Sequence, residues 1–280
     1  MFSDVLLTVD FDRTLTAPDS TIPERNLEAI RYFTANGGVF TMNTGRSTNT
    51  MGSLLETLPV NAPFLLYNGS AAYENGRLIN CHPIELDVWQ TIEEICSRFP
   101  EINLEIQSDG PHYLYRPRRE FMEFYDAVGW KYRPAEPGIS MDPVLKFALF
   151  GPVHEKAVAG FFTGSQAEMD RMDELEQWLN ERYAGFVTVF RSAPRIVDVH
   201  AAGISKGLSA RWLQKRLGRK ILVCVGDAEN DITMLDNADF AFVPGDAILA
   251  DRYENVCKCS DGAVADVIYK KIPEILHIQP

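Results

Sequence analysis

The sequence predicts an α/β fold, with a parallel sheet core and a second, α+β domain inserted into it. Toward both ends of the chain, short continuous apolar runs alternate with amphipathic helical patterns, as is typical of parallel strands covered by helices on both faces. In the middle, strand-like runs follow each other directly across turn residues, which favours antiparallel pairing. We therefore expect the core at 1–85 and 193–280 and the insert at 86–192.

The first 85 residues show the alternation most clearly. The opening strand is the apolar run VLLTV, and the next helix carries Leu27, Ile30 and Phe33 at helical spacing before it ends at a Gly-Gly pair. Farther along, the dipeptide Asn75-Gly76 favours a type I′ hairpin turn. The expected elements are a strand at 5–9, a helix at 23–36, a strand at 39–44, a helix at 48–58, a strand at 63–68 and a hairpin over 71–79.

The rest of the chain divides into the insert and a return to the core pattern. In the insert we expect strands at 102–107, 112–116, 144–151 and 185–191, with helices between them. In the C-terminal part we expect a helix at 205–217, a strand at 221–226, a helix at 230–237, a strand at 240–243 and a helix at 263–272. The core is thus expected to be a Rossmann-like parallel sheet.

Composition limits the class of protein. The 39 acidic residues outnumber the 27 basic ones, for a net charge of −12, which argues against nucleic acid or an anionic membrane as partner. An anionic substrate would need a local cation. No apolar run approaches the roughly 20 residues of a membrane span, the first strand leaves no room for a signal peptide, and the five cysteines lack metal-ligand spacing. We expect a reduced, cytoplasmic protein, a monomer or small homo-oligomer.

Two carboxylates close the first strand. Asp10 and Asp12 follow its apolar run at positions i and i+2, so both can face one site. Burying an unpaired carboxylate is costly, and Mg²⁺ with a phosphate group is the partner that such a pair suits. A turn with helix-capping duties is the alternative.

Polar groups also follow three other elements. Thr44 and Gly45 end the second strand, where a hydroxyl and backbone amides can approach an anion. Lys206 stands just inside a helix that Ser205 caps, an unfavourable place for a cation unless an anion lies nearby. Each also has an ordinary explanation, as a strand-to-helix junction or a solvated lysine. The last group, at the end of strand 221–226, comprises Asp227, Asn230 and Asp231, of which Asp231 could simply be an acid in the first turn of a helix.

Together and in this order, the four groups resemble the motifs of the haloacid dehalogenase superfamily of phosphotransferases. More narrowly, the chain resembles the Cof-type sugar-phosphatase-like family, which has a large α+β cap inserted after the second motif. DFDRTLT matches D-x-D-x-T, NTGRS the threonine motif, GISKG the lysine motif and GDAEND the G-D-x-x-N-D motif, and YNGS at 67–70 is similar to another family stretch. Arg13 is a departure, because glycine is commoner there.

The resemblance implies a Mg²⁺-dependent phosphatase acting on a small phosphorylated metabolite. Asp10 would attack the phosphorus to give an aspartyl-phosphate, and Asp12 would serve as general acid and then general base. The metal would be held by Asp10, Asp12 and Asp227, with Asp231 in support. Phosphoryl oxygens would be held by Thr44, Gly45, Lys206 and Asn230, an inventory sufficient for phosphoryl transfer.

Other classes of protein remain open at this point. A phosphomutase of the same superfamily is the closest alternative, although the spacing of the lysine and G-D-x-x-N-D motifs favours the hydrolase. A signalling receiver domain also combines acids, Mg²⁺, Thr and Lys, but it has no inserted domain of this size. A non-catalytic binding protein on this fold would have no need of both aspartates and the lysine.

Overall fold

The chain folds into two compact units in the computed structural model, which describes residues 1–156 and 158–277. The first unit comprises 1–45, 53–80 and the chain from Ser205 onward, and the second comprises 46–52 and 81–204. The second unit thus extends beyond the expected insert, 86–192, at both ends and includes a short segment from the N-terminal part.

A five-stranded parallel sheet forms the centre of the first unit. Its strands are β1 (Val5–Val9), β2 (Val39–Met42), β12 (Ile221–Val225), β13 (Phe240–Val243) and β14 (Glu254–Asn255), in the order β14-β13-β12-β1-β2. Every neighbouring pair in this sheet is parallel. All residues of β1 and β2 are buried, as their uninterrupted apolar runs predict.

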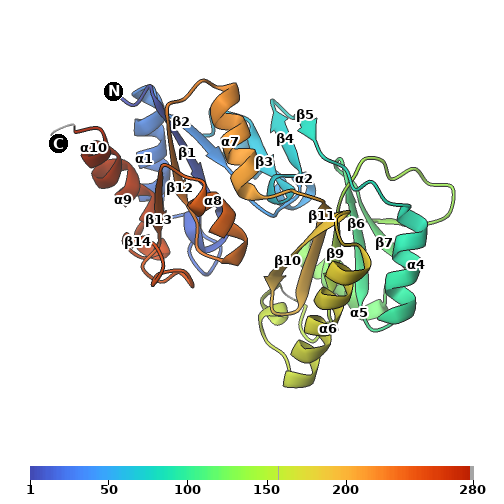
Figure 1. The fold of residues 1–280 in the computed structure, drawn as a ribbon. Helices are drawn as coiled ribbons and strands as arrows, with labels where there is room; N and C mark the ends of the chain where they lie inside the picture. The colour runs from blue at the N-terminus through green and yellow to red at the C-terminus, as the bar shows by residue number, and fades with distance from the viewer. Residues whose placement is uncertain (157, 278–280) are drawn as a thin grey trace. The chain divides into compact units, whose positions relative to one another are not determined.

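Helices cover both faces of this sheet. Figure 1 shows α1, α9 and α10 on one face and α7 and α8 on the other. Their bounds are α1 (Glu24–Ala35), α7 (Lys206–Arg216), α8 (Ile232–Asp236), α9 (Ala263–Asp266) and α10 (Ile272–Ile275), with a π-helical turn (Val267–Lys271) between the last two. The expected α/β class with a parallel core is confirmed.

The third apolar run of the chain lies outside the parallel sheet. β3 (Phe64–Leu66) pairs antiparallel with β4 (Ala71–Glu74), and β5 (Arg77–Cys81) completes a small three-stranded sheet. Asn75 and Gly76 both have positive φ, as the predicted type I′ turn requires. This turn folds β5 back onto β4, while one bridge from Leu65 to Asn43 joins the small sheet to the end of β2. The expected helix at 48–58 is interrupted at Gly52 (φ +52), giving α2 (Thr48–Met51) and α3 (Leu54–Thr57).

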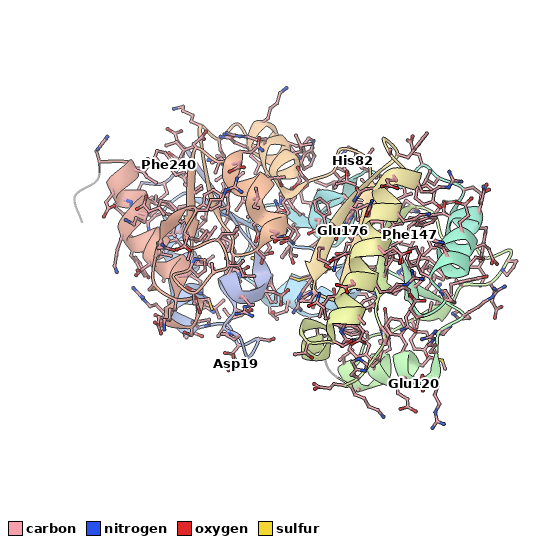
Figure 2. The ribbon with its side chains drawn as sticks, turned by 60° about the horizontal axis from the view of Figure 1, so that its bottom comes forward. Asp19, His82, Glu120, Phe147, Glu176 and Phe240 are labelled. Carbon is pink, nitrogen blue, oxygen red and sulfur yellow. The ribbon has the colours of Figure 1, made fainter. Side chains whose placement is uncertain are left out.

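The second unit is built on a six-stranded sheet in the order β10-β11-β9-β6-β7-β8. All its pairs are antiparallel except β7–β8. The strands are β6 (Asn103–Ser108), β7 (His112–Tyr115), β8 (Arg133–Pro134), β9 (Val144–Phe150), β10 (Val187–Ala193) and β11 (Ile196–Ala201), and the helices are α4 (Val88–Arg98), α5 (Arg119–Val128) and α6 (Gln166–Arg182). Figure 2 draws their side chains, with Glu120 on α5 and Glu176 on α6.

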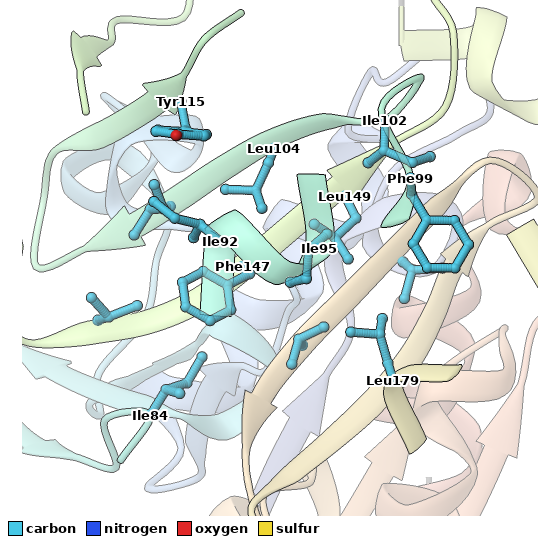
Figure 3. Close-up of a cluster of buried hydrophobic side chains, with 14 of the residues drawn as sticks. Ile84, Ile92, Ile95, Phe99, Ile102, Leu104, Tyr115, Phe147, Leu149 and Leu179 are labelled. Atoms are coloured by element: carbon cyan, nitrogen blue, oxygen red, sulfur yellow. The ribbon is translucent and has the colours of Figure 1, made fainter. Parts of the chain in front are cut away.

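Two apolar clusters hold this unit together. The larger joins one face of the sheet to α4 and α6, and Figure 3 shows Ile92, Ile95 and Leu179 from these helices with Leu104 and Phe147 from the sheet. The smaller cluster packs α5 on the opposite face. Because each face carries its own cluster, the alternate residues of the central strands are buried on both sides of the sheet.

Strand β11 explains why the second unit extends past residue 192. We expected Pro194 to mark a crossing between the two domains, but it lies in the hairpin between β10 and β11. β11 pairs with β9 through Val197 and Val199, both of which belong to the larger apolar cluster. The pattern IVDVHA thus belongs to the antiparallel sheet.

Two further expectations concern the whole chain. All five cysteines have free thiols in this structure. Among the described residues, none of the helices combines the length and the hydropathy that a bilayer-spanning segment requires.

Candidate active site

Three strands of the parallel sheet end level with one another at its carboxyl edge. Val9 is in register with Met42 on one side and with Val225 on the other. The next residues continue the pairing, because the Asp10 amide donates to the Val225 carbonyl and the Asn43 amide to the Val9 carbonyl, both at 2.9 Å. The polar residues that follow these strands therefore meet at one edge, where open α/β sheets bind ligands.

Three aspartates gather there. Asp10, Asp227 and Asp231 are buried, and one carboxylate oxygen from each lies within 4.8 Å of the others. All eight site residues expected from the sequence lie in the first unit. Asp12 is half-buried in the turn Phe11–Leu15 that follows β1, where its own backbone is extended, and it is not a member of this carboxylate group.

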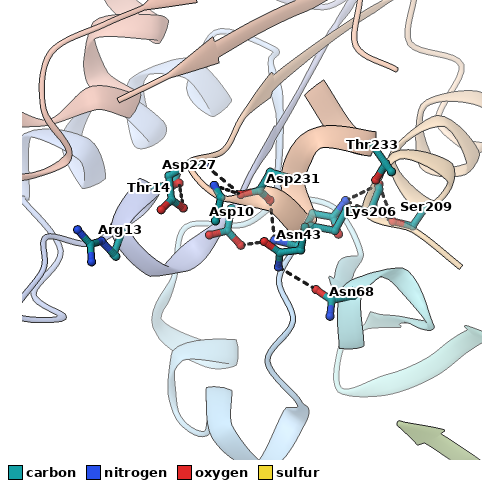
Figure 4. A network of polar contacts seen from close by, with 12 residues as sticks. Asp10, Arg13, Thr14, Asn43, Asn68, Lys206, Ser209, Asp227, Asp231 and Thr233 are labelled. Carbon is teal, nitrogen blue, oxygen red and sulfur yellow. Dashed lines mark hydrogen bonds and ion pairs between the residues drawn. The ribbon is translucent and has the colours of Figure 1, made fainter. Parts of the chain in front are cut away.

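Lys206 connects two of the aspartates (Figure 4). Its Nζ donates to Asp10 Oδ1 and to Asp231 Oδ1, each at 2.6 Å, and its side chain is only 1% exposed. Ser205 caps the helix as expected, its hydroxyl accepting from the Leu208 amide at 3.2 Å. The lysine at the start of α7 therefore has buried anions as partners, which is the explanation for a cation at a helix N-terminus that the sequence left open.

Burial sets the protonation of this cluster. It raises the pKa of the Asp10 carboxyl well above its usual range, with Asp231 and Asp227 adding to the increase and Lys206 opposing it. Burial, and then Asp231, also raises the pKa of Asp227 to about 7. For Lys206, burial alone would lower the pKa, but Asp10 and Asp231 outweigh it and hold the pKa above its ordinary value. The cluster thus favours a charged lysine and disfavours three ionised aspartates together.

Side chains and backbone fix the loop after β12. Thr14 Oγ1 donates to Asp227 Oδ1 at 3.0 Å. Asp231 Oδ2 accepts from the backbone amides of Asp227 and Ala228 at 3.0 and 3.1 Å. Both oxygens of Asp231 are thereby engaged, one by Lys206 and one by the loop. Asp231 therefore supports the position of Asp227.

The remaining expected residues surround the same edge. Thr44 is buried, and its amide donates to the Leu65 carbonyl at 3.0 Å. Gly45 follows it, and Asn230 Nδ2 donates to Asn68 Oδ1 at 3.2 Å. Arg13 is exposed with φ +60, a left-handed conformation that suits glycine better. This explains why glycine is commoner at that position in the family that the four motifs resemble.

Several residues of the network were not singled out from the sequence. Thr14 was visible as the threonine of D-x-D-x-T, and Asn68 as part of YNGS. Asn43 had no signal beyond a polar residue at the end of a buried strand, yet its Nδ2 donates to the Lys206 carbonyl at 2.8 Å and to Ser209 Oγ at 3.3 Å. It ties the end of β2 to the first turn of α7.

The donor set fits a divalent cation. Three carboxylates against one ammonium leave two negative charges when all are ionised, and the oxygens are hard ligands of the kind that Mg²⁺ prefers. Burial is the main cause of the raised pKa values of Asp10 and Asp227, and the neighbouring aspartates add to the increase. A cation placed among these oxygens would favour the ionised carboxylates and so oppose this increase.

Comparison with known proteins assigns the family. The model of the haloacid dehalogenase-like hydrolases matches residues 7–259. The chain belongs to this family. Similar curated proteins include the HMP-PP phosphatase of Escherichia fergusonii, 23% identical over 87% of this chain and 85% of that protein, and the putative phosphatase YxeH of Bacillus subtilis, 24% identical over 87% and 88%.

Solved structures agree with the fold. A haloacid dehalogenase-like hydrolase from Bacteroides thetaiotaomicron matches with a TM-score of 0.77 and 21% identity, over 95% of this chain and 98% of that one. A sugar phosphatase of HAD subclass IIB matches with a TM-score of 0.73 and 19% identity, over 98% and 99%. The family membership expected from the four motifs is confirmed, as is the enzyme class, a phosphoric monoester hydrolase.

Proposed function

We propose that this hydrolase removes the phosphate from a small phosphorylated metabolite, with Mg²⁺ as cofactor and a phosphoryl-enzyme intermediate on Asp10. The observation that carries the proposal is the placement of the Asp10 carboxylate at the carboxyl edge of the sheet, held by Lys206 and adjacent to Asp227. The lysine orients one Asp10 oxygen, which leaves the carboxylate positioned as a nucleophile.

The two aspartates after β1 would divide the chemistry. An Asp10 oxygen forms a bond to phosphorus as the ester P–O bond breaks, and Asp12 gives its proton to the leaving oxygen. Asp12 then takes a proton from water as the water attacks the phosphorus, releasing inorganic phosphate and restoring Asp10. Asp12 is half-buried and lies two residues beyond the nucleophile, a place compatible with proton exchange with water.

The surrounding groups would stabilise the negative charge of the phosphoryl group. Thr44, the backbone at Gly45, Lys206 and Asn230 hold the phosphoryl oxygens, so that the transferring group meets donors in place. Asp10, the Asp12 carbonyl and Asp227 would hold Mg²⁺, supported by Asp231, and the ion supplies charge neutralisation. Both Asp231 oxygens accept hydrogen bonds from protein donors, which favours a role for Asp231 in positioning Asp227 and Lys206 rather than in binding the metal directly.

The proposed substrate class rests on the relatives. Curated proteins similar to this chain are named as phosphatases of HMP-PP, and a solved structure with the same fold is a sugar phosphatase. Because every expected site residue lies in the first unit, we also propose that the second unit acts in selecting the ester rather than in the phosphoryl chemistry.

A panel of phosphate esters tests the proposal. Released inorganic phosphate is measured with Mg²⁺, with EDTA, and for Asp10→Asn, with Asp4→Asn as the matched control because Asp4 pairs with Lys220 at the surface. We expect turnover with Mg²⁺, none in EDTA or in Asp10→Asn, and normal turnover in the control. Full activity in EDTA would overturn the metal dependence. An isomerised ester without phosphate release would identify the phosphomutase instead.

A further inference from the structure

A buried turn with an unusual backbone follows β3. Tyr67, Asn68 and Gly69 have φ values of +54°, +54° and +96° in succession, and all three are buried. The left-handed region is unfavourable for tyrosine, more tolerable for asparagine and natural for glycine. A buried run of this kind persists only where the surroundings hold it, and such runs concentrate at functional sites.

Asn68 contacts two of the segments proposed to bind phosphate. Its backbone amide donates to the Thr44 carbonyl at 3.0 Å. Its side chain lies so close to Gly45 that a Cβ there would be 2.9 Å from Asn68 Oδ1. On the other side, Asn68 Oδ1 accepts from Asn230 Nδ2 at 3.2 Å. One buried side chain thus links the loops after β2 and β12.

Gly69 extends the linkage to the third segment. A Cβ at Gly69 would lie 2.7 Å from both the Ser205 carbonyl oxygen and Ser209 Oγ. The turn therefore packs its backbone directly against the first turn of α7, which begins at Lys206. Only glycine fits there, for both its φ and its contact distance. The turn 67–69 touches every segment that carries a proposed phosphate-binding group.

We propose that Asn68 is a positioning residue that orients the side-chain amide of Asn230 toward the phosphoryl group. The inference rests on the proposed function, in which Asn230 holds a phosphoryl oxygen. An amide nitrogen has two hydrogens. With one of them given to Asn68 Oδ1, Asn230 keeps its NH₂ end fixed and has the second hydrogen for a phosphoryl oxygen. Without that acceptor, the amide can rotate and present its own oxygen, which repels phosphate.

A double-mutant cycle separates this role from support of the fold. Asn68→Gly removes the amide but keeps a residue at ease with φ +54, Asn230→Ala removes the oriented group, and the two are then combined. The matched control is Asn75→Gly, because Asn75 is also left-handed (φ +51) but lies at the exposed turn of the β4–β5 hairpin. The readouts are KM, kcat, inhibition by inorganic phosphate with Mg²⁺, and the thermal unfolding midpoint.

We expect Asn68→Gly to raise KM and the inhibition constant for inorganic phosphate about fivefold, as for one lost hydrogen bond, in a variant that is still fully folded at the assay temperature. Because Asn68 acts through Asn230, the double variant should be no worse than Asn230→Ala alone. The inference would be overturned, with the proposed function intact, if Asn68→Gly kept the wild-type affinity for phosphate. It would also be overturned if the increases in KM and in the inhibition constant for the two single substitutions added in the double variant. A wild-type enzyme with neither turnover nor phosphate inhibition would overturn both.

Discussion

Replacing Lys206 by methionine should destabilise the protein far more than replacing an exposed lysine. The ammonium of Lys206 lies 2.6 Å from both Asp10 Oδ1 and Asp231 Oδ1, and its side chain is 1% exposed. Removing one partner of a buried ion pair leaves an uncompensated charge and costs about 3–5 kcal/mol. Because one ammonium here serves two carboxylates, we expect a loss near the upper end, about 5 kcal/mol, at pH 8 without metal.

The loss should depend on pH in a defined direction. Burial already raises the pKa of Asp10 and of Asp227, and removing the lysine raises both further, because its charge opposes the increase. At pH 5 these carboxylates of the variant can take up protons in the folded state, so less uncompensated charge remains buried. The free-energy difference between variant and wild type should therefore be smaller at pH 5 than at pH 8.

Urea unfolding in EDTA at the two pH values measures this difference. The matched control is Lys220→Met, whose lysine pairs with Asp4 at 3.0 Å but has a side chain 76% exposed. A surface pair of this kind contributes about 0–1 kcal/mol. A loss for Lys206→Met below about 1 kcal/mol, or a loss that is equal at pH 5 and pH 8, would refute the description of Lys206 as the compensating charge of a buried acidic cluster.

Three further predictions concern the same edge of the sheet. The pKa of Asp227, raised by burial to about 7 without metal, lies above its unfolded value, so its ionisation costs stability as pH rises toward 7. Mg²⁺ should therefore raise Tm more at pH 8 than at pH 6, and equal increases in Tm would count against Asp227 as a metal ligand. Thr14→Val removes the hydrogen bond that lowers this pKa. It should therefore raise, about fivefold, the Mg²⁺ concentration that gives half of the increase in Tm, and an unchanged concentration would be contrary evidence. Gly207→Ala would place a methyl group 2.1 Å from the Thr233 carbonyl and should cost about 1–3 kcal/mol in urea unfolding, despite the better helix propensity of alanine; a more stable variant would contradict this close approach of α7 and α8.

The strand ends could be predicted because their signal is local. A continuous apolar run that stops at a carboxylate marks both the strand and its end, and parallel pairing then brings Asp10 and Asp227 to one edge. The partners of Lys206 could not be predicted from local sequence, because its position at a helix start indicated a nearby anion but not which residue supplies it. Only the packing of α7 against the sheet identifies Asp10 and Asp231 as its partners.

The boundary of the second unit could not be predicted from the same kind of signal. The pattern IVDVHA suits a strand of either sheet, and Pro194 suits either a crossing or a hairpin turn. What decides is pairing with β9, a partner about 50 residues earlier in the chain, which local sequence does not specify. Asn43 was missed for a related reason, because its partners on α7 are distant in the sequence.

The most direct test of the account is to isolate the phosphoryl group on the enzyme. The protein is mixed with a phosphate ester and Mg²⁺, quenched in acid within the first turnover, digested and analysed by mass spectrometry, with Asp10→Asn treated in the same way. The account predicts one phosphoryl group on the peptide that contains Asp10, lost on treatment with hydroxylamine and absent from the variant. Turnover of the ester with no phosphoryl group on Asp10, or with the group on another residue, would contradict it.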